Sequence, residues 1–479
     1  MSSRGEDDST LASESDILQG RVGLTPGATR RVLVLVWSRD EPERVGELFA
    51  PPKGAHDQTF SIGRTSAPDE DGALSLPLVR LRPYSRVETG PLRGGRISRR
   101  QLRLHINAQG SWHVERVARS KLRINGAYVR TSELGLGDLI EVERRFSLLV
   151  ATRPRRWPND ARECEDFPFG HADGHGLVGE STAAWTLRGH IAFVGPRGGH
   201  VLVHGPSGSG KELVVRALHR SSDRGATKLV SRNAATIPES LVDAELFGNL
   251  RNFPNPGTPE RPGLFGQANH STLFLDEIGE LPVALQARLL RVMDQGEYQR
   301  LGEASARSTN ARVVGATNRE LTQLKHDVLA RFFHRIRLPG LNSHLDDLPL
   351  LARHALTRIA RGDPKLRSRF FAGQHPRISA ELVAALVRRT YTTHVRELIE
   401  LLWRSLRASR GELLELPPEL RDEHAPAGAE ELDDRPITRE RVIDALERSD
   451  GVLERAWRRL GLRNRYQLHR LIKKFNIQR

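Results

Sequence analysis

The sequence has almost no cysteine and no long apolar run. Cys164 is the only cysteine in 479 residues, so no disulfide can form within the chain, and a reducing cytoplasm is the expected compartment. No segment approaches the ~18 consecutive apolar residues that span a bilayer. Residues 1–30 are polar and lack the apolar core of a signal peptide, so we expect neither secretion nor a membrane partner.

Lysine is also scarce, and arginine supplies most of the positive charge. The net charge is +15 and the isoelectric point is about 10.6. A basic excess suits binding to phosphate backbones, but an arginine-rich composition also arises from genome bias, and the total charge does not separate the two. The length and the hydrophobic content of 38% predict about two to four globular domains joined by linkers.

The first third of the chain has the texture of a β protein. We expect residues 1–29, which are acidic and rich in serine, to be disordered. Over 30–153, short strands alternate with turns. Residues 31–37 form an apolar strand, and 101–106 with 111–115 flank an Asn-Ala-Gln-Gly turn typical of a hairpin. Frequent turns without a helical period predict a β-sandwich.

The rest of the chain is predicted to hold three further folded segments. Residues 154–178 are rich in Pro, Gly, Asp and His and indicate a linker; strands and helices then alternate over 179–340 as in a parallel α/β sheet. Residues 341–410 have a helical apolar period, 411–436 indicate a second linker, and 437–479 hold short amphipathic helices. The predicted fold class is multidomain: an all-β domain, an α/β domain with a helical segment, and an all-α C-terminal domain.

A glycine-rich loop follows the apolar strand 201–203 and precedes a helix. Its spacing is Gly-x-x-x-x-Gly-Lys, and its candidate ligands are Gly205, Ser207, Gly208, Ser209, Gly210, Lys211 and Glu212. Glycines let backbone N–H groups turn toward phosphate oxygens, Lys211 adds a point charge, and the helix N-terminus adds its partial positive charge. Glu212 stands where the general motif has Ser or Thr for Mg²⁺. The alternative is a chance glycine-rich turn, against which strand, loop, lysine and helix all agree.

Two carboxylates end the apolar strand 272–275. Asp276 is a candidate to hold Mg²⁺, directly or through water, and Glu277 to orient and deprotonate the attacking water. An acidic strand end beside a solvated helix is common by itself. With a phosphate loop upstream in the same α/β pattern, the pair predicts a site that binds ATP and Mg²⁺ and hydrolyses the nucleotide.

Residues 175–408 resemble the AAA+ core of bacterial enhancer-binding proteins, the ATPases that activate sigma-54 RNA polymerase. The matching runs are GPSGSGKEL from Gly205, NAA from Asn233, ELFG from Glu245, TLFLDEIGELP from Thr272, QARLLRV from Gln286, GATN from Gly315 and VREL from Val395. The resemblance implies an AAA+ fold with a helical lid, assembled as a homo-oligomeric ring. It also implies roles for five residues: Asn233 as the sensor of Glu277, Thr317 and Asn318 in the sensor I strand, Arg396 as sensor II, and Arg331 as the group that reaches a neighbour's γ-phosphate.

The chain departs from this family's sequence at three places. The Gly-Ala-Phe-Thr-Gly-Ala loop that contacts sigma-54 is replaced by residues 249–259, which contain three prolines. Lys325 occupies one of two arginine positions near the subunit boundary, and lysine is a point charge where arginine presents a planar fork. The family's Trp-Pro-Gly-Asn before VREL reads Tyr391-Thr392-Thr393-His394.

The N-terminal sandwich resembles a forkhead-associated (FHA) domain. Ile62-Gly63-Arg64 and Arg96-Ile97-Ser98-Arg99 carry the match. The resemblance implies a phosphothreonine partner whose phosphate is held by Arg64, Ser98 and Arg99. Gln101 stands where the family usually has His, and the family's Ser-x-Asn-Gly run reads Ala118-Arg119-Ser120-Lys121. The alternative is a sandwich kept for packing or subunit contacts, with solvated arginines.

Residues 437–479 resemble a Fis-type helix-turn-helix. Gly461-Leu462 is the turn, and the predicted core stripe is Val442, Ala445, Leu446, Ala456, Trp457, Tyr466, Leu468, Leu471 and Ile472. From Val452 to Arg479 the chain has nine Lys/Arg and one Glu, a local charge of +8. The resemblance implies binding to promoter-distal DNA sites, with the candidates Arg463, Asn464, Arg465, Gln467, His469, Arg470 and Lys473. The alternative is a basic solvated tail.

The motifs together predict a cytoplasmic bacterial transcriptional regulator that senses a phosphothreonine partner, binds DNA, and uses ATP hydrolysis to remodel a transcription complex. Two other classes stay open. Without the Gly-Ala-Phe-Thr-Gly-Ala loop, the chain fits a nucleotide-gated DNA-binding repressor or scaffold that no longer acts on sigma-54. The third class is a phosphopeptide adaptor in which the ATPase fold is only structural.

Overall fold

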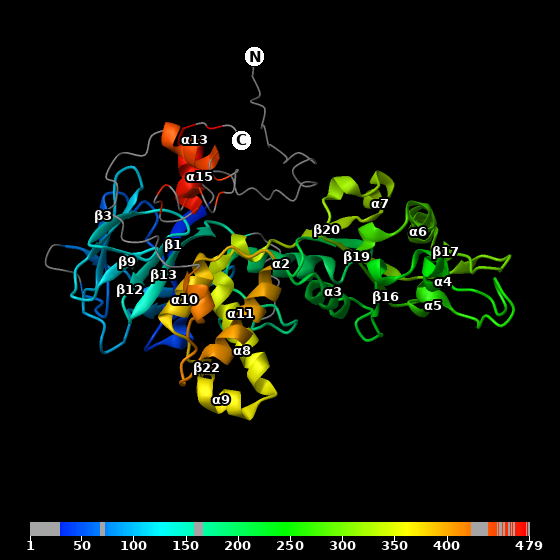
Figure 1. The fold of residues 1–479 in the computed structure, drawn as a ribbon, viewed down its shortest axis with the longest axis horizontal. Coiled ribbons are helices and arrows are strands. Elements are labelled where there is room, and N and C mark those ends of the chain that lie inside the picture. Colours follow the sequence, from blue (N-terminus) through cyan, green and yellow to red (C-terminus); the bar gives the residue numbers. More distant parts are fainter. Residues whose placement is uncertain are drawn as a thin grey trace, which may run out of the picture. The chain divides into compact units, whose positions relative to one another are not determined.

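The computed structural model describes residues 29–67, 72–157, 166–422, 439–447 and 465–475, with single positions between and after the last two ranges. The chain forms two compact units. One contains residues 189–339, and the other contains residues 30–188 and 340–479. The chain crosses from one unit to the other at Arg188–Gly189 and again at Pro339–Gly340. Each unit is described by itself below, with the element labels of Figure 1.

Two β-sheets form the N-terminal part of the second unit, which we call the β domain. The larger sheet has eight strands in the order β10 (Ala127–Val129), β9 (Leu122–Ile124), β12 (Leu139–Val142), β13 (Phe146–Pro154), β1 (Thr29–Ser38), β2 (Leu48–Phe49), β5 (Leu78–Arg82) and β6 (Ser85–Gly90). The smaller sheet has five, in the order β11 (Thr131–Leu134), β8 (Trp112–Arg116), β7 (Leu102–Ile106), β3 (Gln58–Ile62) and β4 (Leu74–Ser75). The expected hairpin is confirmed, because β7 and β8 pair antiparallel with Ile106 opposite Trp112.

Strand β1 is buried on both faces. Leu33 and Leu35 belong to the core between the two sheets, whereas Val32, Val34 and Val36 point the other way, into a second apolar cluster. An antiparallel sheet usually leaves one face to solvent, and its strands then alternate apolar with polar residues. The unbroken run Val-Leu-Val-Leu-Val is the sequence signature of a strand covered on both sides.

The cover is the predicted helical lid. Its elements are α8 (Leu348–Arg361), α9 (Pro364–Phe370), β21 (Phe371–Ala372), β22 (His375–Pro376), α10 (Ala380–Arg388) and α11 (His394–Ala408), followed by α12 (Pro418–Asp422). Helix α10 contacts β12 and β13, as Figure 1 shows. Leu382, Leu386 and Leu402 of the lid share one cluster with Val34 of β1 and Leu149 of β13. The β domain and the lid therefore have a common hydrophobic core.

Part of each expected linker is packed into this unit. Phe167 stacks on Trp185, and the Arg82 guanidinium lies over both rings. Arg82 also forms a buried ion pair with Glu180 at 2.7 Å. In the second expected linker, Leu414 and Leu420 are buried in the core shared with the lid. A composition rich in Pro and Gly indicates breaks in regular structure, and such segments can still be fixed by a few buried anchors.

The other unit is built on a five-stranded parallel sheet. The order is β15 (Val230–Asn233), β16 (Thr272–Asp276), β19 (Arg312–Thr317), β14 (Val201–His204) and β20 (His334–Arg337), so the α/β prediction is confirmed. The helices of this unit are α3 (Lys211–Arg220), α4 (Val242–Phe247), α5 (Gly263–Gln267), α6 (Val283–Gln295) and α7 (His326–Arg331), and α2 (Thr182–Val194) crosses its boundary. Strand β14 lies inside the sheet, where the connections run to either side, and ligands bind at the carboxyl ends of strands at such a point.

The C-terminal residues form a small helical cluster. Its described helices are α13 (Arg439–Glu447) and α15 (Arg465–Lys474). The predicted core stripe is confirmed for eight of its positions, among them Val442, Ala445, Ala456 and Leu468; the Tyr466 side chain lies outside the described residues. Among the helices of the described ranges, none is both long and apolar enough to cross a membrane.

The buried ion pair between Arg153 of β13 and Asp346 is a testable support of the shared core. The Arg153 Nη1–Asp346 Oδ2 distance is 2.6 Å, and burial raises the pKa of Asp346. Arg153→Met leaves that carboxylate buried without its partner, so we expect a loss of about 3–5 kcal/mol in the free energy of unfolding. Urea denaturation, followed by hydrogen exchange in β13 and α8, measures it. The double variant R153M/D346L should recover most of the loss, and a single-variant loss below about 1 kcal/mol contradicts the assignment.

Candidate functional site

The glycine-rich loop lies between β14 and α3 at the carboxyl edge of the parallel sheet. A side chain at Gly205 would place its Cβ 2.5 Å from the carbonyl oxygen of Leu338, so only glycine allows this approach. Gly208 and Gly210 have φ of 76° and 101°, in the left-handed region that other residues avoid. The glycines therefore shape a loop whose backbone N–H groups can turn inward, as phosphate binding requires.

Lys211 is positioned by the loop that it follows. Its side chain is buried, and Nζ donates to the carbonyl oxygens of Gly205 at 3.0 Å and Pro206 at 3.4 Å. Helix α3 begins at Lys211 with glycine as its N-cap, so no side chain caps its first N–H groups. A lysine ammonium and a helix N-terminus thus lie at one place, an arrangement whose charge suits an anion.

Two other loop residues behave differently from each other. The Ser209 hydroxyl oxygen is buried and has no hydrogen-bond partner among the described residues. An orphaned buried hydroxyl at this position fits an absent phosphate or hydrated Mg²⁺. Glu212 instead pairs with Arg216 one turn along α3, at 2.6 Å on the exposed face. Of the two, Ser209 is the better candidate for the bound group.

The carboxylates lie at the end of β16, near the loop. Strand β19 is hydrogen-bonded to both β16 and β14, and the Gly205 N–H donates to the Thr317 carbonyl at 3.2 Å. Glu277 has φ of 50°, a left-handed conformation that turns its side chain away from the strand's alternation. Its Oε2 accepts the Asn318 N–H at 3.2 Å. The structure therefore brings Glu277 and the sensor I strand together.

Asn233 lies at the end of β15 as expected, but its expected hydrogen bond to Glu277 is not found within the described residues. It is paired by register with Asp276 across β15 and β16. Its Oδ1 accepts the Ala235 N–H at 2.9 Å and so caps the short helix Ala234–Thr236. Within the described residues no hydrogen bond joins it to Glu277. Thr317 is fully buried, and its Oγ1 accepts the Arg319 N–H.

His204 is the last residue of β14 before the loop. Burial lowers its pKa, and the nearby Arg337 lowers the pKa further. The imidazole is therefore neutral at neutral pH. It adds no positive charge that would draw phosphate away from Lys211.

The two arginines assigned by resemblance lie in different units. Arg331 ends α7 and forms an ion pair with Asp294 of α6 at 2.6 Å, with nearly half of its side chain exposed. This acidic partner, 37 positions upstream, had no signal in the sequence. Arg396 lies exposed near the start of α11 in the other unit.

Residues 249–261 form a closed loop. The Asn249 peptide pairs with that of Arg261, and the buried Asn249 amide donates to the carbonyls of Leu250 and Pro259 at 2.9 and 2.8 Å. The loop is attached to the turn between β17 (Glu297–Tyr298) and β18 (Arg307–Ser308), since the Leu250 N–H donates to Leu301 at 3.0 Å. The Phe253 ring lies over Gly302 and stays partly exposed.

In the β domain the three predicted phosphate ligands come together. The Arg64 N–H donates to the carbonyls of Ser98 and Arg99 at 3.1 and 3.0 Å, and a Cβ at Gly63 would lie only 2.2 Å from the Arg99 carbonyl oxygen. The Arg64 and Arg99 side chains are exposed. Gln101 is fully buried, and its Oε1 accepts the Ser98 N–H at 3.2 Å. Its amide therefore fixes the Ser98 backbone from within the domain.

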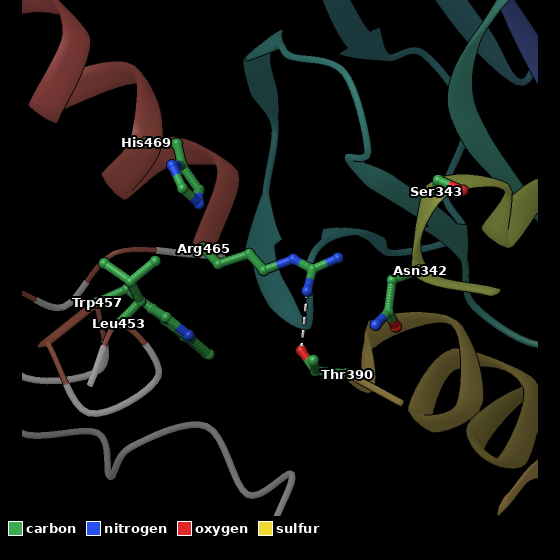
Figure 2. Close-up of a pocket in the computed structure, with 7 residues that line it drawn as sticks. All are labelled: Asn342, Ser343, Thr390, Leu453, Trp457, Arg465 and His469. Carbon is green, nitrogen blue, oxygen red and sulfur yellow. Dashed lines mark hydrogen bonds between the residues drawn. The ribbon is translucent and has the colours of Figure 1, made fainter. Parts of the chain in front are cut away.

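Of the predicted DNA ligands, His469, Arg470 and Lys473 lie exposed on α15, and Gln467 is half-buried. Arg465 is also half-buried, and its Nη1 donates to the Thr390 hydroxyl at 3.1 Å (Figure 2). Arg463 and Asn464 lie outside the described residues.

Comparison with known proteins decides the family. A family model described as the sigma-54 interaction domain matches residues 177–341. The transcriptional regulatory protein ZraR of Escherichia coli K12 is 34% identical over 356 residues, which cover 72% of this chain and 79% of ZraR. The chain belongs to the sigma-54-dependent transcriptional regulators. This regulator has the nucleotide-binding AAA+ domain of its family.

Two further relatives are similar over part of this regulator. The nitric oxide reductase transcription regulator NorR2 of Cupriavidus necator is 39% identical over 274 residues, covering 54% of this chain and 51% of NorR2. A crystal structure of NtrX from Brucella abortus in complex with ADP is 27% identical and covers 63% of this chain and 70% of NtrX, with a TM-score of 0.47.

Proposed function

We propose that this regulator hydrolyses ATP and uses the energy to remodel a sigma-54 transcription complex. The observation that carries the proposal is the convergence of Lys211, the orphaned Ser209 hydroxyl and the tethered Glu277 carboxylate at one edge of the parallel sheet. Asp276 is the candidate to hold Mg²⁺ when the metal is bound, and the metal would neutralise charge on the phosphates.

The chain's own residues supply the rest. Backbone N–H groups of the loop and the Lys211 ammonium bind the phosphate oxygens, and the Asn318 N–H holds Glu277 so that its carboxylate can take a proton from water. Arg331 would stabilise the γ-phosphate of a neighbouring subunit in a ring, with Asp294 as its resting partner. The sensor II role of Arg396, on α11 of the other unit, stays a prediction from the resemblance.

Lys211→Ala tests the ATP site. Loss of the buried ammonium should lower ATP turnover by roughly a hundredfold or more, because the transferred phosphate loses its main protein charge. Steady-state ATP hydrolysis measures it, with Lys228→Ala as the control, an exposed lysine of the same unit. Unchanged turnover in K211A would sink the site assignment, and so would equal losses in both variants.

The family assigns sigma-54 contact to the segment that is rewritten here as the closed loop 249–261. The alternative function, a nucleotide-gated DNA-binding repressor or scaffold, is favoured by one observation: the loop is attached at Leu250 and Phe253 to the turn at 301–302. We propose that sigma-54 contact is kept, with the partly exposed Phe253 as the aromatic group at the loop surface.

Reconstituted transcription separates the two functions. With sigma-54 polymerase and a promoter carrying an upstream site for this regulator, we expect open complexes only when ATP is present, and loss of them in K211A. Phe253→Ala should reduce open-complex formation while ATP turnover stays near that of the unchanged protein. Absence of ATP-dependent open complexes, with turnover intact, favours the repressor or scaffold.

We also propose that the β domain binds a phosphothreonine peptide at Arg64, Ser98 and Arg99, since the backbone holds these residues side by side. Arg64→Ala or Arg99→Ala should weaken binding of a phosphothreonine peptide library by about tenfold or more, because each removes a charge-assisted hydrogen bond. Fluorescence anisotropy measures it, with the exposed neighbour Arg96→Ala as the control. Binding that is equal for phosphorylated and unphosphorylated peptides contradicts the proposal.

The exposed basic face of α15 is proposed to bind DNA upstream of the promoter. Arg470→Ala should weaken binding and lower the slope of log K against log salt by about one, if Arg470 contacts a phosphate. Titrations at several salt concentrations measure the slope, and Arg404→Ala, on the exposed face of the lid helix α11, serves as the control. An unchanged affinity and slope for R470A would remove this residue from the interface.

A further inference from the structure

The outer face of the eight-stranded sheet is covered by the ATPase lid of the same chain. Val32, Val34 and Val36 of β1 and Leu139 of β12 lie on that face and are at most 1% exposed. Helices α8, α10 and α11 provide the opposing leucines of the same cluster. A sheet face of this composition would be an aggregation liability if uncovered, so the lid is an obligatory cover.

Polar contacts fix the register of the two parts. The Trp37 indole N–H donates to the Ile378 carbonyl at 2.8 Å, just before α10. The Arg388 guanidinium, at the end of α10, donates to the Asn125 carbonyl at 3.1 Å. A Cβ at Gly126 would lie 2.5 Å from that guanidinium, so the glycine leaves room for Arg388 in this position. Directional bonds of this kind specify one docking geometry where apolar contact alone would allow several.

A buried carboxylate adds to this specificity. Glu141 of β12 lies on the lid side of the sheet and pairs with Arg123 at 3.0 Å. Arg388 of α10 is a second positive charge close to it, and Glu381 of α10 also faces it. Burial raises the pKa of Glu141, while the two arginines lower it. Separation of the lid would remove one of the two cations that hold this charge.

The same packing reaches the places where the chain leaves the unit. Asp347 Oδ1 accepts the N–H groups of Glu180 and Ser181 at 2.7 and 2.9 Å, and Arg153 pairs with the adjacent Asp346. The crossings at Arg188–Gly189 and Pro339–Gly340 follow within a few residues. The β domain and the lid are thus bonded together close to both connections.

We propose that the β domain and the lid move as one rigid body relative to the unit of residues 189–339, which we call the nucleotide-loop unit. A ligand held at Arg64 and Arg99 then acts on nucleotide turnover through the lid helix α11. The proposed effect on nucleotide turnover rests on the proposed ATP site. The proposal that a ligand of the β domain causes this effect rests on the proposed phosphothreonine site. The buried contacts fix the β domain to the lid, and the chain continues from this body into the unit that contains Lys211.

Three exposed lysines allow a direct test in the full chain. Lys53 lies in the β domain, Lys365 in α9 of the lid, and Lys228 in the nucleotide-loop unit. In a Cys164→Ser background, which removes the only native cysteine, each pair of these lysines is changed to cysteine and spin-labelled. Double electron–electron resonance spectroscopy then measures the three distances between labels, with and without the ATP analogue AMP-PNP and Mg²⁺.

The rigid body predicts a specific pattern. The Lys53–Lys365 distance stays narrow and unchanged, while Lys53–Lys228 and Lys365–Lys228 shift together when AMP-PNP binds. A change in Lys53–Lys365, a shift of Lys365–Lys228 without Lys53–Lys228, or no shift in either overturns the proposal. Nucleotide binding is measured separately by titration with a fluorescent ATP analogue. Failure to bind contradicts the ATP site, and binding without the concerted shift contradicts only the coupling.

A matched pair of substitutions tests whether the shared core carries the coupling. Val34→Asp places a charge in that core, whereas Val87→Asp places the same charge at an exposed position of the same sheet. V34D should broaden the Lys53–Lys365 distances and abolish the shift of Lys53–Lys228, and V87D should do neither.

A second pair of variants applies if V34D does not fold. W37F/R388M removes both directional bonds and should broaden the Lys53–Lys365 distances. W403F/R404M, on the exposed face of α11, is its control. Narrow distances in every folded variant overturn the proposal.

Discussion

Burial of the outer face of the eight-stranded sheet is the constraint on which the second unit depends. Strand β1 has apolar residues on both sides, so the β domain cannot be satisfied by the core between its two sheets alone. The lid helices complete it, and the β domain in turn covers the apolar stripes of α8 and α10. At this interface, each part has an apolar face that is covered by the other part. Strand β1 and lid helices that begin more than 300 residues further along the chain therefore belong to one structural body.

In the nucleotide unit the corresponding constraint is the close approach of backbone segments at the carboxyl edge of the parallel sheet. The Leu338 carbonyl excludes any side chain at Gly205, and the Thr317 carbonyl accepts the Gly205 N–H. These contacts hold the glycine-rich loop against β19 and the residues that follow β20. The left-handed Glu277 then presents its carboxylate to Asn318, one residue beyond that strand. Residues far apart in sequence that are candidates for the nucleotide site are brought together by three neighbouring strands.

Residues 249–261 form a loop that its own backbone closes and that a neighbouring turn holds. The peptide pair between Asn249 and Arg261 closes the loop, and the Asn249 amide satisfies carbonyl groups inside it. Leu250 and Phe253 attach it to the turn at 301–302.

Local sequence determined the elements whose physics is local. The spacing from Gly205 to Lys211 requires a strand, a tight loop and a helix N-terminus, and the apolar run before Asp276 requires a buried parallel strand, so this edge of the site was predictable. The period of α10 and α11 and the stripe of the C-terminal helices were equally readable, because amphipathic spacing reports which face is buried. The unbroken apolar run Val32–Val36 also indicated that this strand is buried on both faces. It did not indicate which segment of the chain covers the outer face.

Tertiary structure alone decided the pairs between distant residues. No sequence pattern reports these pairs by their spacing, because they depend on how whole elements pack. The pairs are Arg153 with Asp346, Trp37 with Ile378, Arg388 with Asn125 and Arg331 with Asp294. The fate of Asn233, which caps a short helix instead of bonding to Glu277, was hidden for the same reason. Sequence determined that a sandwich, an ATPase core, a lid and a basic helical tail exist. Packing of one apolar sheet face decided that the sandwich and the lid are a single body.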